Sequence, residues 1–384
     1  MTPKKIRPAG RISSSLVLFL LFALTACELQ QAAKLADMQA LVDQVGAQFV
    51  PDKRLDVFHV ELQQDDGKVS LTGEVVNPAL PVALLDSLTK TYPGADFVDE
   101  IKVLPDSGLG SRTYGIVKIG VANQRRAPKF QAELVNQSLL GSVVRIYKVQ
   151  GAFYYIQNWD GYLGWMSKGS VVRVDSAAAA AWQTAESVVC ISNYGVVADL
   201  LGGANEEYIV DLAPGATLKK LGSRAGFVKV ETPDRRVGFV KEGTVVARAK
   251  MLAVRATRDR IVETSRKFLG VPYLWGGSTA KGFDCSGFVQ NVFFLNNMNL
   301  PRDASQLANE GTEVDPGKEF ENLMPGDLLF FGDKPGRITH VAIYLGDRLY
   351  IHASHSVHIK SLDAGHPLFS EYRYNAFQKA TRLL

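Results

Sequence analysis

Cys285 is the residue of this 384-residue chain with the clearest capacity for covalent chemistry. It follows a glycine-rich stretch that ends at Asp284, and the residues after it are apolar at helical spacing. The cysteine is therefore predicted to lie at a helix N-terminus. Unpaired backbone N–H groups and the helix dipole there favour a thiolate and lower the pKa from its free value of about 8.5. A thiolate in this position could attack a carbonyl carbon.

Histidine is the usual proton acceptor for such a cysteine, and five of the six histidines follow residue 339. Apolar alternation predicts two strands, over residues 340–346 and 349–354, that pair through a turn at Gly346-Asp347. His340 and His352 can then share one sheet face, with His340 as the base and His352 as the residue that orients its ring. Three further histidines are predicted to lie at the surface: His355, His358 and His366.

Two other interpretations of these residues are open. Cys285 could be a structural cysteine, or it could bind zinc together with His340 and His352. Zinc sites of this kind usually carry CxxC or HxxxH spacing, which the sequence lacks. The sequence therefore predicts no metal and no cofactor.

The elements around Cys285 predict a mixed α+β domain over residues 251–384. Residues 257–270 form an amphipathic helix that ends at Gly270, as helices often end at glycine. A second helix follows Cys285, and four strands come after it. The order is helix, helix, then antiparallel sheet.

An internal repeat precedes this domain. Four marker residues recur 74 positions further on: Gly141 as Gly215, Phe153 as Phe227, Gly164 as Gly238 and Gly169 as Gly243. Short strands closed by glycine turns at this spacing predict two small β-barrels, over residues 111–176 and 185–250. The alanine run at 177–181 is expected to connect them. Two similar β modules without a binding role are the alternative.

Residues 1–27 are typical of an export signal. A basic start precedes an apolar run at 16–24, which is shorter than the roughly 20 residues of a membrane span. Leu24-Thr25-Ala26-Cys27 resembles the lipobox of bacterial lipoproteins, which implies that Cys27 is acylated. Glu28 after the cysteine favours the outer membrane, facing the periplasm. An ordinary signal peptide and an uncleaved anchor helix are the alternatives.

Residues 28–110 predict a small α+β module and a linker. A polar helix is followed by strand, strand, helix and strand, an order that resembles a BON-type module. From Cys27 onward the chain carries 43 − 4 = 39 basic and 39 acidic residues, because four basic residues and no acidic ones precede it. This balance leaves no excess of basic residues of the kind that binds nucleic acid. Cys190 lies in an apolar run and is predicted to be buried; we expect it and Cys285 to be free thiols, with a disulfide as the alternative.

The motifs in residues 255–365 resemble the NlpC-type cell-wall cysteine peptidases, a circularly rearranged papain-like family. The matching segments are PYLWGG, FDCSGFV, LPRDASQ, GDLLFF, THVAIYLG and IHAS, in that order. The resemblance implies Cys285 as nucleophile, His340 as base, His352 as third member and Tyr273 near the oxyanion, where the backbone N–H of Cys285 would help. It also implies peptidoglycan stem peptides as substrates. Tyr273 could instead be a packed aromatic residue.

Two SH3-type barrels before such a domain resemble a subgroup that hydrolyses γ-D-glutamyl–diamino-acid bonds in peptides with a free N-terminal L-Ala. The resemblance implies that Asp284 and Ser286 hold the ammonium group and that Tyr162 of the first barrel closes the pocket, with Ser305 as a further candidate. A carboxylate is a suitable ammonium partner. Asp284 could equally be the N-cap of the following helix.

The sequence thus predicts an α+β multidomain, lipid-anchored peptidase of the bacterial envelope. Its expected partners are stem peptides or muropeptides and, through the lipid, a membrane; nucleic acid is not expected, and the protein is expected to be a monomer. One alternative is an endopeptidase that acts on intact cross-linked wall. Another is a non-catalytic protein that binds the cell wall.

Overall fold

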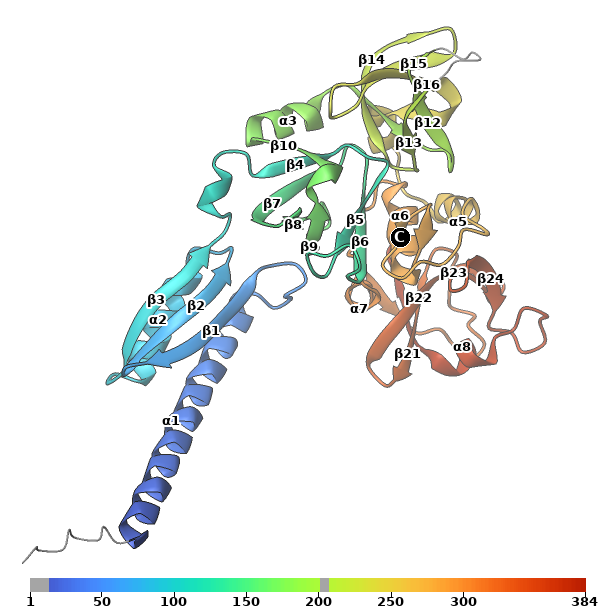
Figure 1. Cartoon of the computed structure of the whole chain (residues 1–384). Coiled ribbons are helices and arrows are strands. Elements are labelled where there is room, and N and C mark those ends of the chain that lie inside the picture. The colour runs from blue at the N-terminus through green and yellow to red at the C-terminus, as the bar shows by residue number, and fades with distance from the viewer. Residues whose placement is uncertain (1–13, 201–206) are drawn as a thin grey trace, which may run out of the picture. The chain divides into compact units, whose positions relative to one another are not determined.

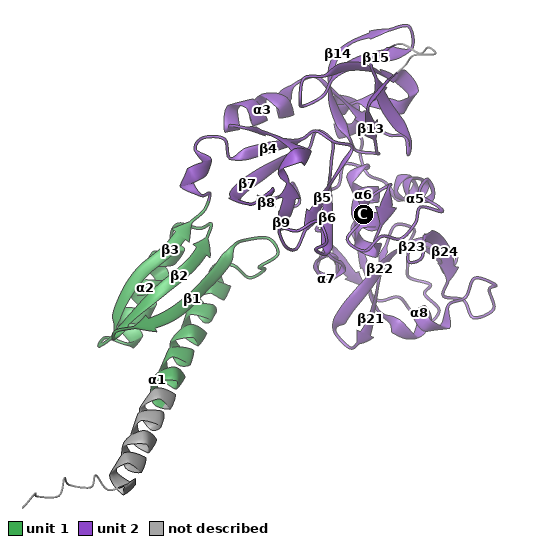
Figure 2. Cartoon of the chain, viewed as in Figure 1, with its two compact units in different colours: residues 1–104 green, residues 105–384 purple. Residues whose placement is uncertain are grey.

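The computed structural model describes residues 14–200 and 207–384, with side chains from residue 30 onward. The chain divides into two compact units, residues 1–104 and 105–384 (Figure 2). The predicted export signal lies partly, and the Cys27 side chain wholly, outside the described residues. Among the described residues, no helix is long and apolar enough to cross a membrane.

The first unit contains the predicted strand–strand–helix–strand order. It comprises α1 (Ser14–Phe49), β1 (Phe58–Asp65), β2 (Lys68–Val75), α2 (Leu80–Thr91) and β3 (Asp96–Val103). β1 and β2 are antiparallel, and α2 provides the crossover that makes β3 parallel to β2. Its core is closed by the apolar face of α2, where Leu80, Leu84 and Leu88 are buried.

Two seven-stranded sheets stand at the start of the second unit, as the repeat predicts. The first contains β4 (Tyr114–Val117), β5 (Val121–Arg125), β6 (Leu134–Leu139), β7 (Val143–Gln150), β8 (Phe153–Gln157), β9 (Leu163–Ser167) and β10 (Val171–Val174). The second contains β11 (Ser187–Cys190), β12 (Gly195–Ala198), β13 (Tyr208–Leu212), β14 (Thr217–Arg224), β15 (Phe227–Glu231), β16 (Val237–Lys241) and β17 (Val245–Ala247). Their strand orders are equivalent, β10-β4-β7-β8-β9-β5-β6 and β17-β11-β14-β15-β16-β12-β13.

Short helical turns precede the first barrel and lie within both barrels. They are η1 (Ser107–Leu109), η2 (Lys168–Ser170) and η3 (Glu242–Thr244). The alanine-rich connector is helical, α3 (Ser176–Thr184), and α4 (Arg248–Leu252) leads out of the second barrel. Gly141 is required where the barrels meet, because it has φ +83° and a Cβ there would lie 2.1 Å from the Thr217 carbonyl oxygen.

The remaining elements form the catalytic domain. They are α5 (Arg258–Arg266), β18 (Ser278–Thr279), β19 (Gly282–Phe283), α6 (Cys285–Phe294), α7 (Ala304–Leu307), β20 (Thr312–Val314), β21 (Leu328–Lys334), β22 (Arg337–Gly346), β23 (Leu349–Ala353), β24 (Val357–Ser361), α8 (Glu371–Ala376) and β25 (Phe377–Arg382). The main sheet has the order β20-β25-β21-β22-β23-β24, and its neighbours are antiparallel, as predicted.

Helix α6 packs against β22 and β23 (Figure 1), and its first nine residues are buried. Its apolar residues, among them Phe288 and Val292, belong to one core cluster with Val341, Ile343 and Ile351 of the sheet. Burial of these side chains supplies the hydrophobic free energy that holds the N-terminus of α6 against the sheet. The position of Cys285 is therefore set by the core.

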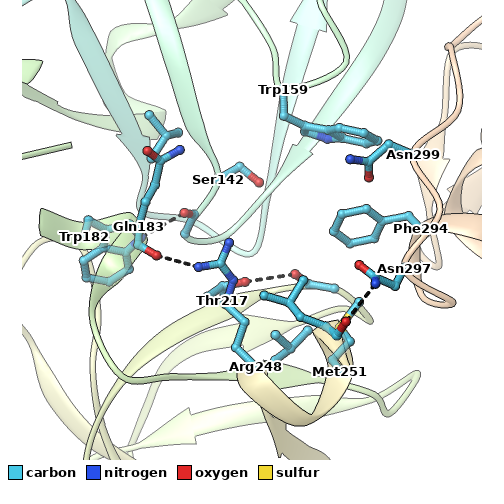
Figure 3. Close-up of a pocket in the computed structure, with 15 residues that line it drawn as sticks. Ser142, Trp159, Trp182, Gln183, Thr217, Arg248, Met251, Phe294, Asn297 and Asn299 are labelled. Atoms are coloured by element: carbon cyan, nitrogen blue, oxygen red, sulfur yellow. Dashed lines mark hydrogen bonds between the residues drawn. The ribbon is translucent and has the colours of Figure 1, made fainter. Parts of the chain in front are cut away.

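A cavity of about 280 Å³ lies where both barrels meet the catalytic domain (Figure 3). Trp159 of the first barrel and Phe294 at the end of α6 stack on one of its sides, with ring centroids 5.1 Å apart. Trp182 of α3 lines it and donates a hydrogen bond from its indole N–H to the Gly141 carbonyl. This cavity has no lining residue in common with the pocket that contains Cys285.

Buried polar contacts bind the first barrel to the catalytic domain. The Ser278 hydroxyl donates to Asn136 Oδ1 at 2.9 Å, and the Ser278 N–H donates to Gln137 Oε1 at 3.1 Å. Gln290 of α6 donates to Asp160 Oδ2 at 3.1 Å. Partners of this kind satisfy groups that would be costly to bury alone.

Arg302 is the charged centre of this interface. Its side chain is 1% exposed and makes two hydrogen bonds to the Asp284 carboxylate, one of them 3.0 Å from Nη1 to Oδ1. Its Nε donates to Asn136 Oδ1 of the first barrel at 3.1 Å. One guanidinium group thus links the residue before Cys285 to strand β6.

We expect Arg302→Leu to lower the free energy of unfolding by about 3–5 kcal/mol, because it leaves the Asp284 carboxylate buried without its cation. Adding Asp284→Asn should recover part of the loss. Arg236→Leu is the control, since it removes an arginine whose ion pair with Asp234 is exposed. Urea and thermal unfolding of the full chain measure the difference. An Arg302 variant no less stable than the Arg236 variant would contradict this account of the interface.

Candidate active site

Cys285 is the first residue of α6, as the sequence predicts. The Asp284 side chain caps the helix by accepting the Gly287 N–H at 2.7 Å. Cys285 is 8% exposed and lines a pocket of about 320 Å³. The same pocket is lined by the other candidates that the sequence analysis placed around the substrate, Tyr162, Tyr273, Asp284, Ser286 and Ser305.

The pKa of Cys285 differs from the expectation. Burial raises the pKa of this thiol to about 11, and the negative charge of Asp284 acts in the same direction. Hydrogen bonds from the backbone at Val341 and Ser286, and the positive charge of Arg302, lower it without overcoming burial. The prediction of a resting thiolate was therefore wrong, because it counted the helix terminus and omitted the cost of desolvating a charge.

His340 and His352 meet as the strand pattern predicts. The turn that joins β22 to β23 is Asp347-Arg348, one residue later than predicted, because Gly346 still pairs with Leu349. Both turn residues have positive φ, which suits a tight hairpin. This register brings His340 Nε2 within 2.7 Å of His352 Nδ1. Direct contact between the two ring nitrogens leaves no room for a metal ion between them. In the described part of the chain, no group of three or more His, Cys, Asp or Glu residues could hold a metal ion.

Both imidazoles are neutral bases in this environment. Burial lowers the pKa of His340 well below its usual range, and the nearby charges of Arg373 and His358 add to the shift. Burial likewise lowers the pKa of His352, followed by the effects of the two other histidines, Arg373 and Lys360. A neutral His340 can accept a proton from a neutral thiol at the moment of attack.

His358 is not the surface residue that the sequence analysis predicted. Strand β24 pairs with β23 so that His358 lies opposite His352, and their Nε2 atoms are 3.2 Å apart. His358 is half-buried, and its Nδ1 lies 2.8 Å from the Ser356 carbonyl oxygen. A strand is predicted here, as the last of the four after the second helix, but it was not paired with the strand that contains His352, and His358 was therefore placed at the surface.

Tyr273 stands beside the nucleophile as an un-ionised phenol. Burial raises its pKa, and the neighbouring Cys285 and Asp284 raise it further. Its backbone N–H donates to the His355 carbonyl at 2.9 Å, which fixes the residue against the turn after β23. A protonated phenol can donate a hydrogen bond to an oxygen that becomes negative during acyl transfer.

The expectation that Asp284 and Ser286 hold an ammonium group needs correction. Both carboxylate oxygens of Asp284 accept from Arg302, and they also accept the N–H groups of Gly287 and Gly276. The Ser286 hydroxyl donates to Asp284 and accepts from Arg302. The negative charge of Asp284 is thus matched inside the protein, and the N-cap role is the one observed.

Tyr162 contacts the carboxylate of Asp303, not that of Asp284. Its ring is 7% exposed, and its hydroxyl donates to Asp303 Oδ2 at 3.2 Å, across the boundary between the first barrel and the catalytic domain. Glu133 of the same barrel accepts the Trp275 indole N–H at 2.9 Å and pairs with Arg126. All five residues line the pocket. This end of the pocket is therefore built jointly by two domains.

The sequence analysis missed three of these residues, Arg302, Asp303 and Glu133. Arg302 and Asp303 both stand in the segment LPRDASQ, which was used to identify the family but was given no role beyond Ser305. Glu133 had no local signal, since it follows a loop in the first barrel. Cys190 is buried and a free thiol, as predicted, and burial raises its pKa to about 11.

Comparison with known proteins agrees with this architecture. The model of the NlpC/P60 family matches residues 270–378, and the model described as the bacterial dipeptidyl-peptidase Sh3 domain matches residues 125–171. The crystal structure of an NlpC/P60 family protein from Bacillus cereus superposes with a TM-score of 0.61 at 22% identity, over 71% of this chain and all of that one. This likeness confirms the predicted α+β fold, and the two family models confirm an NlpC/P60 domain and an SH3-like domain.

Curated relatives extend the match. A protein named dipeptidyl-peptidase 6 from Lysinibacillus sphaericus is 30% identical over 67% of this chain and 94% of its own length. A γ-D-glutamyl-L-lysine dipeptidyl-peptidase from Bacillus subtilis is 32% identical over 50% of this chain and 60% of its own. A buried cysteine at a helix start, two paired histidines and these matches together place the chain in the NlpC/P60 family of cysteine peptidases.

Proposed function

We propose that this protein hydrolyses the γ-D-glutamyl–diamino-acid bond of peptidoglycan fragments that carry a free N-terminal L-Ala. The observation that carries the proposal is the hydrogen bond between Tyr162 of the first barrel and Asp303 of the catalytic domain, which both line the pocket beside Cys285. We infer that this contact closes one end of the pocket. A closed pocket favours a short peptide end over a strand that continues. The name of the Bacillus subtilis relative, a γ-D-glutamyl-L-lysine dipeptidyl-peptidase, supports a bond of this kind, and both relatives are named dipeptidyl-peptidases.

The reaction follows from the protonation states of the site. His340 takes the proton of the Cys285 thiol as the sulfur attacks the γ-carbonyl carbon. The resulting oxyanion is stabilised by the Tyr273 hydroxyl and by the backbone N–H of Cys285 at the start of α6. The tetrahedral intermediate collapses to a thioester as His340 returns the proton to the leaving amine. Water activated by His340 then hydrolyses the thioester and regenerates the thiol.

Recognition of the substrate amine is assigned to Asp303 in place of Asp284. An ammonium at the closed end would lie near the Asp303 carboxylate, with the Tyr162 ring as a wall and Ser305 beside it. Asp284, Ser286 and Arg302 then form the neutral floor of the pocket next to the nucleophile. A charge-assisted hydrogen bond in such a place contributes about 1.5–3 kcal/mol.

The pH dependence tests the neutral base. His340 acts when unprotonated, and its lowered pKa means that protonation begins only at acidic pH. We expect kcat/KM to stay constant from pH 8 down to about the ordinary histidine pKa of 6.5 and to fall below it. Cys285→Ala lacks the nucleophile and gives the background rate of the assay. An acid limb with its midpoint at or above pH 6.5 would contradict a neutral base whose pKa is lowered by burial.

Substrate charge tests the closed pocket. N-acetylation of L-Ala-γ-D-Glu-diaminopimelate should lower kcat/KM roughly ten- to hundredfold, and Asp303→Asn should do the same for the free-amine peptide. Asparagine still caps α7, so the helix start is preserved. Tyr162→Phe should have a smaller effect than Tyr162→Ala, because the ring forms the wall.

The matched control is Asp347→Asn, an exposed aspartate of the same domain at positive φ, which asparagine tolerates. Its kcat/KM should equal that of the unmodified protein. Product release from free muropeptides and from intact sacculi is compared by mass spectrometry. Sacculi cleaved as fast as the free tripeptide would replace this proposal with an endopeptidase of cross-linked wall.

We also propose that acylated Cys27 anchors the protein, as a monomer, to the outer membrane on its periplasmic side. The support is the pattern Leu24-Thr25-Ala26-Cys27 after a short apolar run. Cys27→Ser should abolish labelling by radioactive palmitate in intact cells, whereas Cys190→Ser should leave it unchanged. Label that remains on the Cys27→Ser protein would refute the anchor.

A further inference from the structure

Three histidines form a continuous line across three neighbouring strands. His340 of β22 contacts His352 of β23 at 2.7 Å, and His352 contacts His358 of β24 at 3.2 Å. The line ends where His358 Nδ1 meets the Ser356 carbonyl oxygen at 2.8 Å. We call His340, His352 and His358 the histidine line.

The terminal carbonyl decides where every proton in the line sits. A carbonyl oxygen only accepts, so Nδ1 of His358 carries a hydrogen, and Nε2 of a neutral His358 is then an acceptor. His352 must therefore donate from Nε2, which leaves its Nδ1 as an acceptor. His340 consequently donates from Nε2 to His352. This leaves Nδ1 of His340 with a lone pair, the one ring nitrogen still able to accept the thiol proton.

We propose that His358 is a positioning residue that holds His340 in its proton-accepting tautomer through His352. The inference rests on the proposed role of His340 as base. Without an acceptor at position 358, His352 can carry its hydrogen on Nδ1 and donate it to Nε2 of His340. The His340 hydrogen then moves to Nδ1, which can no longer accept the thiol proton.

Burial and charge favour the neutral line that this argument needs. The pKa values of His340 and His352 are lowered by burial first. Arg373 of α8 and a positive charge on His358 of β24 lower both, and Lys360 of β24 lowers that of His352. The Tyr350 ring of β23 packs against His352 with centroids 5.2 Å apart and keeps its phenol protonated, since burial raises its pKa to about 12. A cation on His340 or His352 is therefore disfavoured before substrate binds.

The tautomers can be read directly in the full-length protein. Long-range ¹H–¹⁵N spectra of ¹⁵N-histidine-labelled protein should show hydrogen on Nδ1 of His358 and on Nε2 of His352 and His340. Assignment uses the single His→Gln variants, and six histidines keep the spectrum tractable. Hydrogen on Nδ1 of His352 in the unmodified protein would overturn the proposal, whatever the substrate proves to be.

Substitution at position 358 tests the effect on reactivity. His358→Leu cannot accept a hydrogen bond, and we expect it to lower kcat about three- to tenfold at unchanged KM, the size of one neutral hydrogen bond. His358→Gln offers an amide oxygen to His352 and should restore kcat to within about twofold. The rate of Cys285 alkylation by iodoacetamide at pH 7 should follow the same order, and it needs no knowledge of the substrate.

His366→Leu is the control, since this half-exposed histidine accepts the Leu368 N–H and lies outside the line. Its kcat and alkylation rate should be unchanged. Equal alkylation in His358→Leu and the unmodified protein would refute positioning by His358. If the spectra show the stated tautomers but the protein cleaves no stem peptide, the proposed function is refuted and the tautomer assignment stands.

Discussion

The buried pair of Arg302 and Asp284 is the interaction on which the rest of the site depends. Asp284 starts α6 and so sets the direction of Cys285, while Arg302 reaches from the catalytic domain to Asn136 of the first barrel. Burying these two charges is costly, and the cost is offset because both Asp284 carboxylate oxygens and all three Arg302 guanidinium nitrogens have hydrogen-bond partners. One ion pair thus couples the position of the nucleophile to the presence of the barrel that forms the far wall.

The electrostatics of the site follow from the same burial. Desolvation raises the pKa of the thiol and lowers the pKa values of both imidazoles, so the resting state has no charge on sulfur or histidine. Charge then appears at the transition state, close to the backbone N–H of Cys285 and the Tyr273 phenol. Fixed donors in a dry pocket stabilise such a charge more strongly than water would.

Much of this arrangement could be predicted from local patterns. The period of two along β22 and β23, with the turn between them, was sufficient to pair His340 with His352, and the 74-residue repeat was sufficient to predict two equivalent sheets. The roles of Arg302 and His358 could not be predicted because they depend on tertiary structure. Arg302 makes a contact between domains, and His358 depends on the register of a third strand, which local sequence patterns do not determine. The thiol pKa was mispredicted for the same reason, since helix position is local and burial is not.

The wall residue Tyr162 precedes the nucleophile Cys285 in the chain by 285 − 162 = 123 residues, and it belongs to a separately folded barrel. A polypeptide is made and translocated from its N-terminus, and its domains generally fold in that order. The strands that position Tyr162 can therefore pair before residues 251–384 are made. The contact with Asp303 waits for the catalytic domain, so the full wall of the pocket and its nucleophile arise together when that domain folds.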